Sequence, residues 1–371
     1  MSVVYKKLEE VCEILDSQRI PITAKDRKVG QYPYYGANGL QDYVAEYIFD
    51  DELVLLAEDG GNFGSTDRPI AYRVSGKCWV NNHAHVLKAK PCIDIDYLGY
   101  SLMFYDTSGL VNGATRQKLT QAAMREMKIP YRNSDEQKEI VRKIDGVFSL
   151  IEKSHLELHH LDQLVKSRFV EMFGAPITNK MGWPCLSLVK TCKAILGGGT
   201  PSKSHPEYFT GGIPWVSPKD MKYAVISDSI DHITEEAVAH STTNLVPKNS
   251  VLMVIRSGIL KHTLPVAINS VPVTINQDMK AFVPGNGVIT EFLMYYFKAI
   301  ESDVLAGVRG VTADNIDFKA FQQRTIIVPP LELQNRFAAF VTEVDKSKLA
   351  VKQSLEKLET LKKSLMQQYF G

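Results

Sequence analysis

The sequence lacks three features that would assign it to a simple class. It has no basic excess, because 43 lysines and arginines face 42 aspartates and glutamates among 371 residues, whereas nucleic-acid binders commonly show one. It has no apolar run of the ~20 residues that cross a bilayer. Lys6, Lys7, Glu9 and Glu10 exclude the apolar core of a signal peptide near the N-terminus. We therefore expect a cytoplasmic protein whose nucleic-acid contacts, if any, depend on local patches or on a partner's charge.

Paired cysteines are also missing. The five cysteines, at positions 12, 78, 92, 185 and 192, form no CxxC pair. An odd, scattered set of this kind favours reduced thiols in protein cores over disulfides or metal ligands.

Much of the chain is present twice. A shift of 197 positions aligns residues 113–174 with residues 310–371 without a gap, and the matches include Gln137 with Gln334 and Phe173-Gly174 with Phe370-Gly371. The parts before them match in outline, as KKLEEVCEIL (6–15) with LSLVKTCKAIL (186–196) and WVNNHAHVLKA (79–89) with TINQDMKAFVP (274–284). Self-similarity at a fixed shift predicts a duplicated architecture.

Each copy combines a β-rich unit with one long helix, so the predicted fold class is α+β. A short β-rich run, a proline and an acidic residue precede the helical pattern in both copies, as expected where a strand ends and a helix begins. The predicted divisions are a first domain at 1–134, a helix at 135–174, a linker at 175–184, a second domain at 185–331 and a helix at 332–371.

Both helical patterns carry a narrow apolar stripe with spacings of three, four and seven, which suits a partner helix better than a broad core. The stripe residues are Val147, Ile151, Leu158, Leu161, Val165, Val344, Val351, Leu355, Leu358 and Leu365. Each helix is predicted to end at Phe-Gly, where glycine supplies a left-handed cap, and to close its own half of the protein.

Three features are more specific than the repeat itself: GGGTPSKSHPEYFTGGIPWVSPKDM (197–221), IIVPPLELQNRFAAFV (326–341) and the repeated helix that ends in Phe-Gly. YPYYGANGLQDYVAEYIFDDELVLLAEDG (32–60) is a weaker fourth. Over essentially the whole chain, the sequence resembles the specificity subunits of type I restriction–modification systems.

This resemblance implies two target-recognition domains, each of which reads one half of a split DNA sequence. It implies that the two helices pair as an antiparallel coiled coil, which fixes the unread spacer, and that the subunit has a pseudo-two-fold axis. The implied partners are double-stranded DNA, two modification subunits that carry S-adenosylmethionine and methylate adenine, and in some systems two restriction subunits that use ATP and magnesium. No cofactor is expected on this chain.

Polar, glycine-flexed turns recur in both β-rich units, and their amides, hydroxyls and cations suit contact with base edges and phosphates. The candidate DNA-binding residues are Tyr34, Tyr35, Asn38, Asn62, Thr66, Asn81, Asn82, Asn112, Thr115, Arg116 and Lys118 in the first domain, and Thr200, Ser202, Lys203, Lys219, Asp220, Arg256, Asn276, Gln277, Arg309 and Thr312 in the second. For any single one, a turn residue that bonds its own backbone is the alternative.

Two groups of candidates have a simpler interpretation. Tyr34, Tyr35 and Trp215 could stack on an extruded base, but core packing is favoured for aromatic residues next to proline in β-rich segments. His83 and His85 could bind a metal, but the sequence around them offers no matched carboxylate or cysteine, so no metal site is expected.

The chain shows no catalytic motif that would make it an enzyme alone. The triple glycine at 197–199 departs from nucleotide-binding loops, because Pro201 and Pro206 disfavour a following helix, and we interpret it as a flexible loop that approaches DNA. VPPL (328–331) lacks the Asn or Asp that leads a methyltransferase motif. The alternatives are the specificity subunit of a related split-target methyltransferase–nuclease or other phage-defence system, a stand-alone enzyme for a phosphorylated ligand, and a coiled-coil scaffold without DNA.

Overall fold

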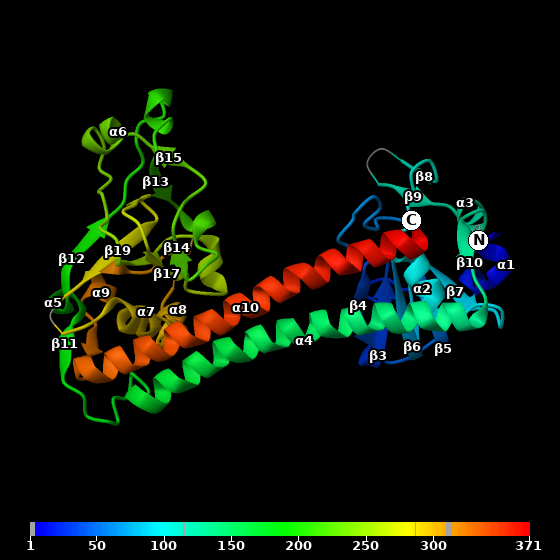
Figure 1. Cartoon of the computed structure of the whole chain (residues 1–371), viewed down its shortest axis with the longest axis horizontal. Helices are drawn as coiled ribbons and strands as arrows, with labels where there is room; N and C mark the ends of the chain where they lie inside the picture. Colours follow the sequence, from blue (N-terminus) through cyan, green and yellow to red (C-terminus); the bar gives the residue numbers. More distant parts are fainter. Residues whose placement is uncertain (1–3, 114–115, 286, 309–313) are drawn as a thin grey trace. The chain divides into compact units, whose positions relative to one another are not determined.

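The structure is a computed structural model that describes residues 4–113, 116–285, 287–308 and 314–371. It divides into two compact units (Figure 1). Unit 1 comprises Met1–Leu156 and Val351–Gly371, and unit 2 comprises Glu157–Ala350. Within the described ranges, none of the helices combines the length and the hydropathy that a membrane span requires.

Unit 1 is built on a six-stranded sheet in the order β2-β7-β5-β6-β3-β4. Its central strand β5 ends in the apolar run Leu53–Ala57, which is fully buried because it contacts neighbours on both faces of the sheet. The elements are β1 (Val4–Lys7), α1 (Leu8–Val11), β2 (Cys12–Ile14), η1 (Asp16–Gln18), β3 (Val29–Gly36), β4 (Gly39–Val44), β5 (Phe49–Ala57), β6 (Ala71–Val80), β7 (Ala84–Ala89), α2 (Ile95–Met103), β8 (Val111–Asn112), β9 (Lys118–Leu119), α3 (Gln121–Arg125), β10 (Lys128–Tyr131) and the first part of α4 (Ser134–Phe173).

Unit 2 has a five-stranded sheet in the order β12-β19-β16-β17-β14 and a three-stranded sheet in the order β15-β13-β18. Its central strand β16 is buried throughout, as is the second half, Leu53–Ala57, of its counterpart β5. The elements are β11 (Cys185–Ser187), α5 (Leu188–Thr191), β12 (Cys192–Gly197), η2 (Pro206–Phe209), β13 (Ile213–Val216), η3 (Pro218–Asp220), β14 (Val225–Ile226), β15 (His232–Ile233), α6 (Glu235–Ala239), β16 (Val251–Val254), η4 (Gly258–Lys261), β17 (Val266–Asn269), β18 (Thr274–Ile275), β19 (Met279–Pro284), α7 (Thr290–Ala299), α8 (Glu301–Ala306), α9 (Phe318–Gln322), β20 (Thr325–Ile327) and the first part of α10 (Leu331–Phe370).

The two units repeat one plan, as the sequence predicted. The order β1-α1-β2 recurs as β11-α5-β12, and Cys12 and Cys192 each begin the strand that follows the one-turn helix. In both units the first strand pairs antiparallel with the strand before the long helix, as β1 with β10 and β11 with β20. The side chains of Thr120 and Asp317, which are 197 positions apart, cap the equivalent helices α3 and α9.

The long helices begin and end one residue earlier than predicted, at 134 and 173 and at 331 and 370. Gly174 adopts a φ of 76° and donates its N–H to the Val170 carbonyl at 2.8 Å, which is the predicted glycine cap. A buried glutamine near each helix start secures the preceding loop. Gln137 bonds Asp94 N and Arg132 O, and its repeat partner Gln334 bonds Ile289 N and Pro329 O.

The Phe-Gly ends do not close their own halves, and that prediction is wrong. Phe173 ends the helix that follows the first domain, but it is buried in unit 2, where its ring meets Phe292 of α7 at 5.0 Å. Phe370 ends the second helix, but it packs in unit 1 against Tyr97 of α2 at 5.2 Å. Each helix end therefore completes the core of the unit whose sheet is encoded by the other copy.

Within each unit the two helices run antiparallel, as expected. In unit 2, Phe169 of α4 meets Phe337 of α10 at 5.4 Å, and Asp162 pairs with Lys348 at 2.6 Å. In unit 1, Lys362 lies over the Phe148 ring, and the later residue Tyr369 accepts a bond from Arg132, which precedes α4. In both units, the residue numbers of the contacts fall along α10 as they rise along α4.

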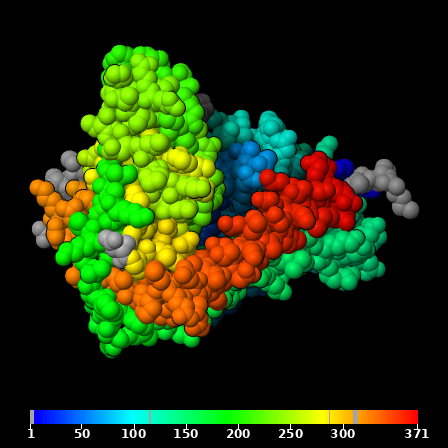
Figure 2. Space-filling model, turned by 60° about the vertical axis from the view of Figure 1, so that its left-hand side comes forward, coloured from blue at the N-terminus to red at the C-terminus, as the bar shows by residue number. Residues whose placement is uncertain are grey.

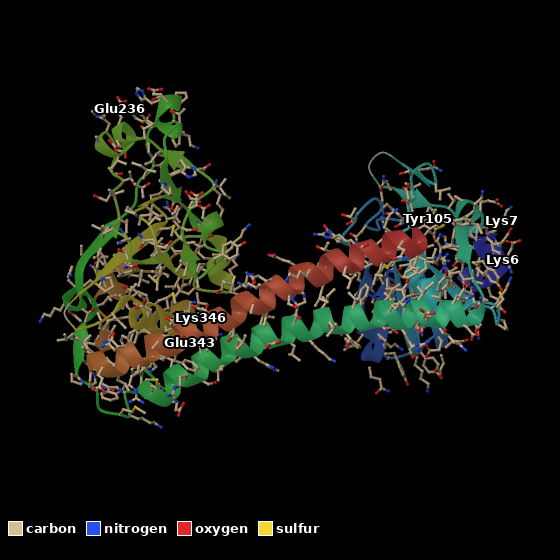
Figure 3. The ribbon with its side chains drawn as sticks, in the orientation of Figure 1. Lys6, Lys7, Tyr105, Glu236, Glu343 and Lys346 are labelled. Carbon is tan, nitrogen blue, oxygen red and sulfur yellow. The ribbon has the colours of Figure 1, made fainter. Side chains whose placement is uncertain are left out.

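The outer surface of α10 is charged and open. Figure 2 shows this helix, from orange to red, uncovered on the face that is seen. Glu343 and Lys346, labelled in Figure 3, pair at 2.7 Å on this surface. The apolar stripe is turned away from solvent to different degrees, with Val147, Ile151, Val165 and Val344 buried and Leu158, Leu161, Val351, Leu355, Leu358 and Leu365 half-buried.

Candidate nucleic-acid interface

In unit 1, three turns that are far apart in sequence are joined by backbone hydrogen bonds. We call residues 58–60, 81–83 and 117–119 the turn frame of unit 1. The frame bonds run from Glu58 N and Asp59 N to His83 O at 2.8 and 3.4 Å, from Gly60 N to Gln117 O at 3.2 Å, from Leu119 N to Glu58 O at 2.7 Å, and from His83 N to Asn81 Oδ1 at 2.8 Å. These bonds, all but the last between main-chain atoms, hold the turn backbones.

Unit 2 has the same turn frame at residues 255–257, 276–278 and 314–316. The bonds run from Ile255 N and Arg256 N to Asp278 O at 2.8 and 3.2 Å, from Ser257 N to Asp314 O at 3.0 Å, from Ile316 N to Ile255 O at 2.9 Å, and from Asp278 N to Asn276 Oδ1 at 3.0 Å. Bond for bond, this is the pattern of unit 1 shifted by 195 or 197 positions.

The side chains on the two frames differ although the backbones match. Asp59 of unit 1 is replaced by Arg256 in unit 2, and His83 is replaced by Asp278. Both pairs are in contact, with His83 Nδ1 2.8 Å from Asp59 Oδ1 and Arg256 Nε 2.6 Å from Asp278 Oδ1. One scaffold thus presents different charges in the two units, as expected for two surfaces that recognise different sequences.

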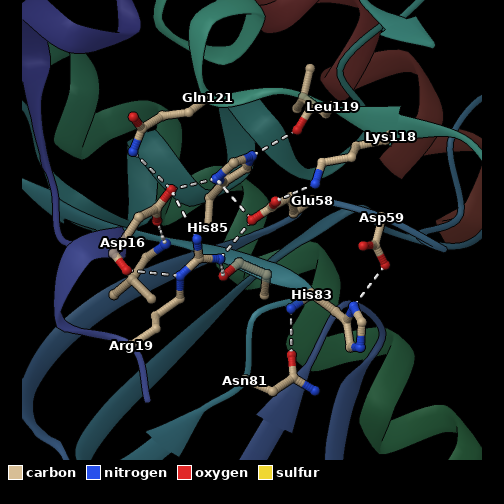
Figure 4. A network of polar contacts seen from close by, with 12 residues as sticks. Asp16, Arg19, Glu58, Asp59, Asn81, His83, His85, Lys118, Leu119 and Gln121 are labelled. Carbon is tan, nitrogen blue, oxygen red and sulfur yellow. Dashed lines mark hydrogen bonds and ion pairs between the residues drawn. The ribbon is translucent and has the colours of Figure 1, made fainter. Parts of the chain in front are cut away.

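A buried ion-pair network adjoins the frame of unit 1 (Figure 4). Both ring nitrogens of His85 face acceptors, with Nδ1 2.6 Å from Asp16 Oδ2 and Nε2 2.9 Å from the Leu119 carbonyl. Arg19 donates to Glu58 Oε2 at 2.7 Å and lies 3.5 Å from Asp16. His85 and Arg19 therefore share this interior with the carboxylates of Asp16 and Glu58.

Burial would raise the pKa values of both carboxyls, but their cationic partners outweigh that effect. The pKa of Asp16 is lowered by the hydrogen bond and charge of His85, and that of Glu58 by hydrogen bonds from Arg19 and Lys118. Asp16, Glu58 and His85 place ligand atoms within 4.8 Å of one another. The expectation that no carboxylate lies near these histidines was therefore wrong. The Arg19 guanidinium lies among these atoms, so the arrangement is that of an ion-pair network.

Several predicted contact residues gather at the frames. In unit 1 they surround Asp59 and Gly60, with Asn38 donating to the Gly60 carbonyl at 3.0 Å, Arg116 to Asp59 at 2.5 Å, and Lys118 pairing with Glu58 at 3.0 Å. In unit 2, Thr200 bonds Gln277, and Arg256 and Asn276 both bond Asp278.

Four candidates are corrected to structural roles, because their side chains are buried and bonded inside the protein. They are Tyr34, Asn81, Asp220 and Asn276. Asp220, for example, accepts bonds from Ser217 and Ile230 in the turn at η3. Tyr35 and Trp215 also pack against hydrophobic clusters, as the core interpretation of these aromatics predicted.

Of the remaining candidates, Asn82 belongs to the frame of unit 1, and the others lie away from the frames or outside the residues that the structure describes. Asn62 and Thr66 lie in the loop between β5 and β6, Asn82 is exposed at the tip of its turn, and Asn112 is exposed in β8. Ser202, Lys203 and Lys219 are exposed in unit 2, where Lys219 pairs with Asp231. Thr115, Arg309 and Thr312 lie outside the described residues.

The triple glycine begins at the end of β12, with Gly197 in the strand and Gly198 and Gly199 in the segment that follows it. A Cβ on Gly198 would lie 1.9 Å from the Asn276 carbonyl oxygen, and one on Gly199 would lie 2.3 Å from Thr242 Oγ1. Glycine is therefore required by the close approach of neighbouring chain segments. The sequence analysis also missed Glu58, Asp59 and Asp278, although the aligned blocks at 79–89 and 274–284 contain one of the equivalent pairs.

A cavity of about 760 Å³ adjoins the frame of unit 2. Arg256, Gln277, Lys280 and Lys319 line it together with Asp317 and the apolar Phe318. The cations outnumber the acid among these residues, and a positively charged hollow of this kind suits a polyanion.

Comparison with known proteins agrees with this arrangement. The family described as type I restriction modification DNA specificity domain matches residues 2–160 and 190–361. The chain is 33% identical over 246 residues to the specificity subunit of the type I restriction enzyme EcoR124I/EcoR124II of Escherichia coli, a match that covers 62% of this chain and 58% of that protein. It is 25% identical to a putative type I restriction enzyme specificity subunit of Haemophilus influenzae, over 92% of this chain and 88% of that protein.

Solved structures show the same fold at low sequence identity. The S subunit of a type I restriction–modification system from M. genitalium superposes with a TM-score of 0.59 at 13% identity, covering all of this chain and 96% of that one. A chain from a structural study of complex assembly and conformational transition in the type I system gives 0.60 at 16% identity, covering all of this chain and 99% of that one. The duplicated plan, the paired helices and the family match establish that this chain belongs to the family of type I restriction–modification DNA specificity domains.

Proposed function

We propose that this chain is the DNA-recognition subunit of a type I restriction–modification complex, in which each unit reads one half of a bipartite target. The observation that carries the proposal is the turn frame, which recurs bond for bond in both units while its exposed side chains change. A protein that held two copies of one ligand would keep the side chains. A protein that reads two different half-sites needs one backbone geometry and two sets of contacts.

The chain acts without catalysis of its own in this proposal. Its partners are double-stranded DNA, two modification subunits that bind S-adenosylmethionine and methylate adenine, and, where the system cleaves DNA, two restriction subunits that use ATP and magnesium. This chain has nearly equal numbers of basic and acidic residues, 43 and 42. This balance supports a complex in which the modification subunits supply much of the positive charge that binds phosphate. The open, charged surface of α10 is available to such partners.

Reconstitution tests the proposal. The chain is mixed with the modification subunit encoded beside it, and transfer of a labelled methyl group from S-adenosylmethionine to DNA is measured. We expect transfer only when both proteins are present, together with DNA binding whose affinity falls steeply with salt on a log–log plot. Methylation of the same sequences by the modification subunit alone would refute the proposal, and so would failure of the two proteins to form a complex.

A further inference from the structure

Each unit has one exposed arginine that an aspartate of its turn frame holds: Arg256 lies in the frame of unit 2, and Arg116 directly precedes the third turn of the frame in unit 1. In unit 1, Arg116 Nη2 donates to Asp59 Oδ1 at 2.5 Å, and the side chains are 60% and 16% exposed. In unit 2, Arg256 donates through Nε at 2.6 Å and through Nη2 at 2.5 Å to Asp278 Oδ1, and the side chains are 48% and 22% exposed. The aspartates are thus set into the surface, and the guanidinium groups stand out from it.

The two arginine–aspartate pairs do not arise by simple copying. Asp59 and Arg256 occupy equivalent positions in the repeat. The same frame position therefore carries the carboxylate of the ion pair in unit 1 and the guanidinium in unit 2. In unit 1 the partner is Arg116, which directly precedes the third turn, and in unit 2 it is Asp278 of the second turn. The same pair has been built twice on one frame from different positions, which points to a shared task rather than to inherited packing.

We infer that Arg116 and Arg256 each read a guanine in the major groove, one in each half-site, and this inference rests on the proposed function. Asp59 and Asp278 are the positioning residues that hold the two arginines. A guanidinium has five N–H donors. Asp278 accepts from Nε and Nη2 on one side of the Arg256 guanidinium, and the described residues leave the donors of its Nη1 and Nη2 edge without another partner. In unit 1, Arg116 Nη2 also lies 3.3 Å from His83 Nδ1, and its Nη1 donors face no described acceptor. The Nη1 and Nη2 edge matches the O6 and N7 acceptors of guanine, the commonest specific protein–DNA contact.

The aspartate has a physical purpose in this arrangement. A free arginine loses rotamer entropy when it binds a base, and an arginine that is already held loses less of it. The aspartate also accepts in a fixed direction, which orients the planar fork. In unit 2, the other oxygen of Asp278 accepts bonds from Asn276 and Gln277, so the carboxylate is itself held. Lysine is a weaker replacement here, because its ammonium group has no planar fork to match the two acceptors of the base.

The test compares methylated sequences across a set of complexes. Arg116→Lys, Arg256→Lys and Asp278→Asn chains are each assembled with the modification subunit, and the relative rates of methylation are measured on a library of targets randomised one base pair at a time. We expect Arg256→Lys to lower discrimination for guanine at one position of one half-site by about 10- to 100-fold. Arg116→Lys should do the same in the other half-site, and Asp278→Asn should relax the same position as Arg256→Lys by a smaller factor.

Matched controls are available within the same units. Arg324 pairs with Asp303 in unit 2, and Arg73 pairs with Asp96 in unit 1, in both cases outside the turn frames. Arg324→Lys and Arg73→Lys keep the charge and should leave base preference unchanged at every position. A general loss of folding in a frame variant would lower all rates together, whereas loss of a base contact changes the preference at one position.

The inference is overturned if the wild-type complex recognises a split sequence but both frame lysine variants keep the wild-type preference, because the arginines then contact phosphate or no DNA. It is also overturned if the position that relaxes is not a guanine. Neither result contradicts the proposed function, which fails only if the wild-type complex shows no split target.

Discussion

The buried phenylalanine at the end of α4 gives a sharp test of how the chain is assembled. Phe173 is fully buried among Phe169, Phe292 and Phe337. Truncation of a buried phenylalanine to alanine costs about 3–5 kcal/mol through lost burial and the cavity that remains. Phe370 is half-buried against Tyr97, so Phe370→Ala should cost about 2 kcal/mol.

The two substitutions should lower stability in different units. Phe173→Ala should raise the opening equilibrium of α7 by roughly 100-fold or more, since 1.4 kcal/mol is a factor of ten. Phe370→Ala should do so at α2 by roughly 30-fold. Native-state hydrogen exchange of the amides in Thr290–Ala299 and Ile95–Met103 measures both effects separately.

The matched control is Val170→Ala, one turn before Phe173 on α4, where the side chain is 49% exposed. A surface change of this kind should stay within about 0.5 kcal/mol. If Phe173→Ala left α7 protected and loosened only unit 1, the helix end would belong to its own half. The account of exchanged helix ends would then be wrong.

Two further predictions concern buried polar groups. Gln137→Ala and Gln334→Ala should each destabilise their unit by about 1–3 kcal/mol, because each glutamine satisfies buried backbone groups that would lose their partners; chemical denaturation with unchanged midpoints would contradict this. Asp16→Asn should cost about 3 kcal/mol at neutral pH, because it strips a charge from the buried network. The pKa of Asp16 is lower in the folded state, so its contribution is present above the unfolded pKa of about 4 and is lost as pH falls through the folded value. The gap between variant and wild type in thermal unfolding should therefore narrow on acidification, and a gap that widened would refute the assignment.

The long helices and the duplication could be predicted from the sequence because their signals are local. The apolar stripe and the Phe-Gly ending give the helix bounds to within one residue, and shifts of 197 and 195 positions align the turns that form the frames. Both signals depend only on the order of residues along the chain.

The long-range partners could not be predicted in the same way. Nothing in the spacing of α4 shows that Phe173 belongs to a core encoded after the helix. Asp16 and His85 are 69 positions apart and meet only because β7 lies beside the turn that follows β2. Tyr34 and Asn81 have the composition of surface turns, and only the packed structure shows that their side chains are enclosed. Side-chain burial is set by tertiary contacts, which the local pattern does not encode.

The most direct test of the central claim is a map of methylated adenines in a host genome. The host should lack its own related system and should express this chain with the neighbouring modification subunit. Two short defined sequences separated by an unread spacer of constant length would agree with one reading surface in each unit. A single continuous motif, or no new methylation from a complex that has formed, would contradict it.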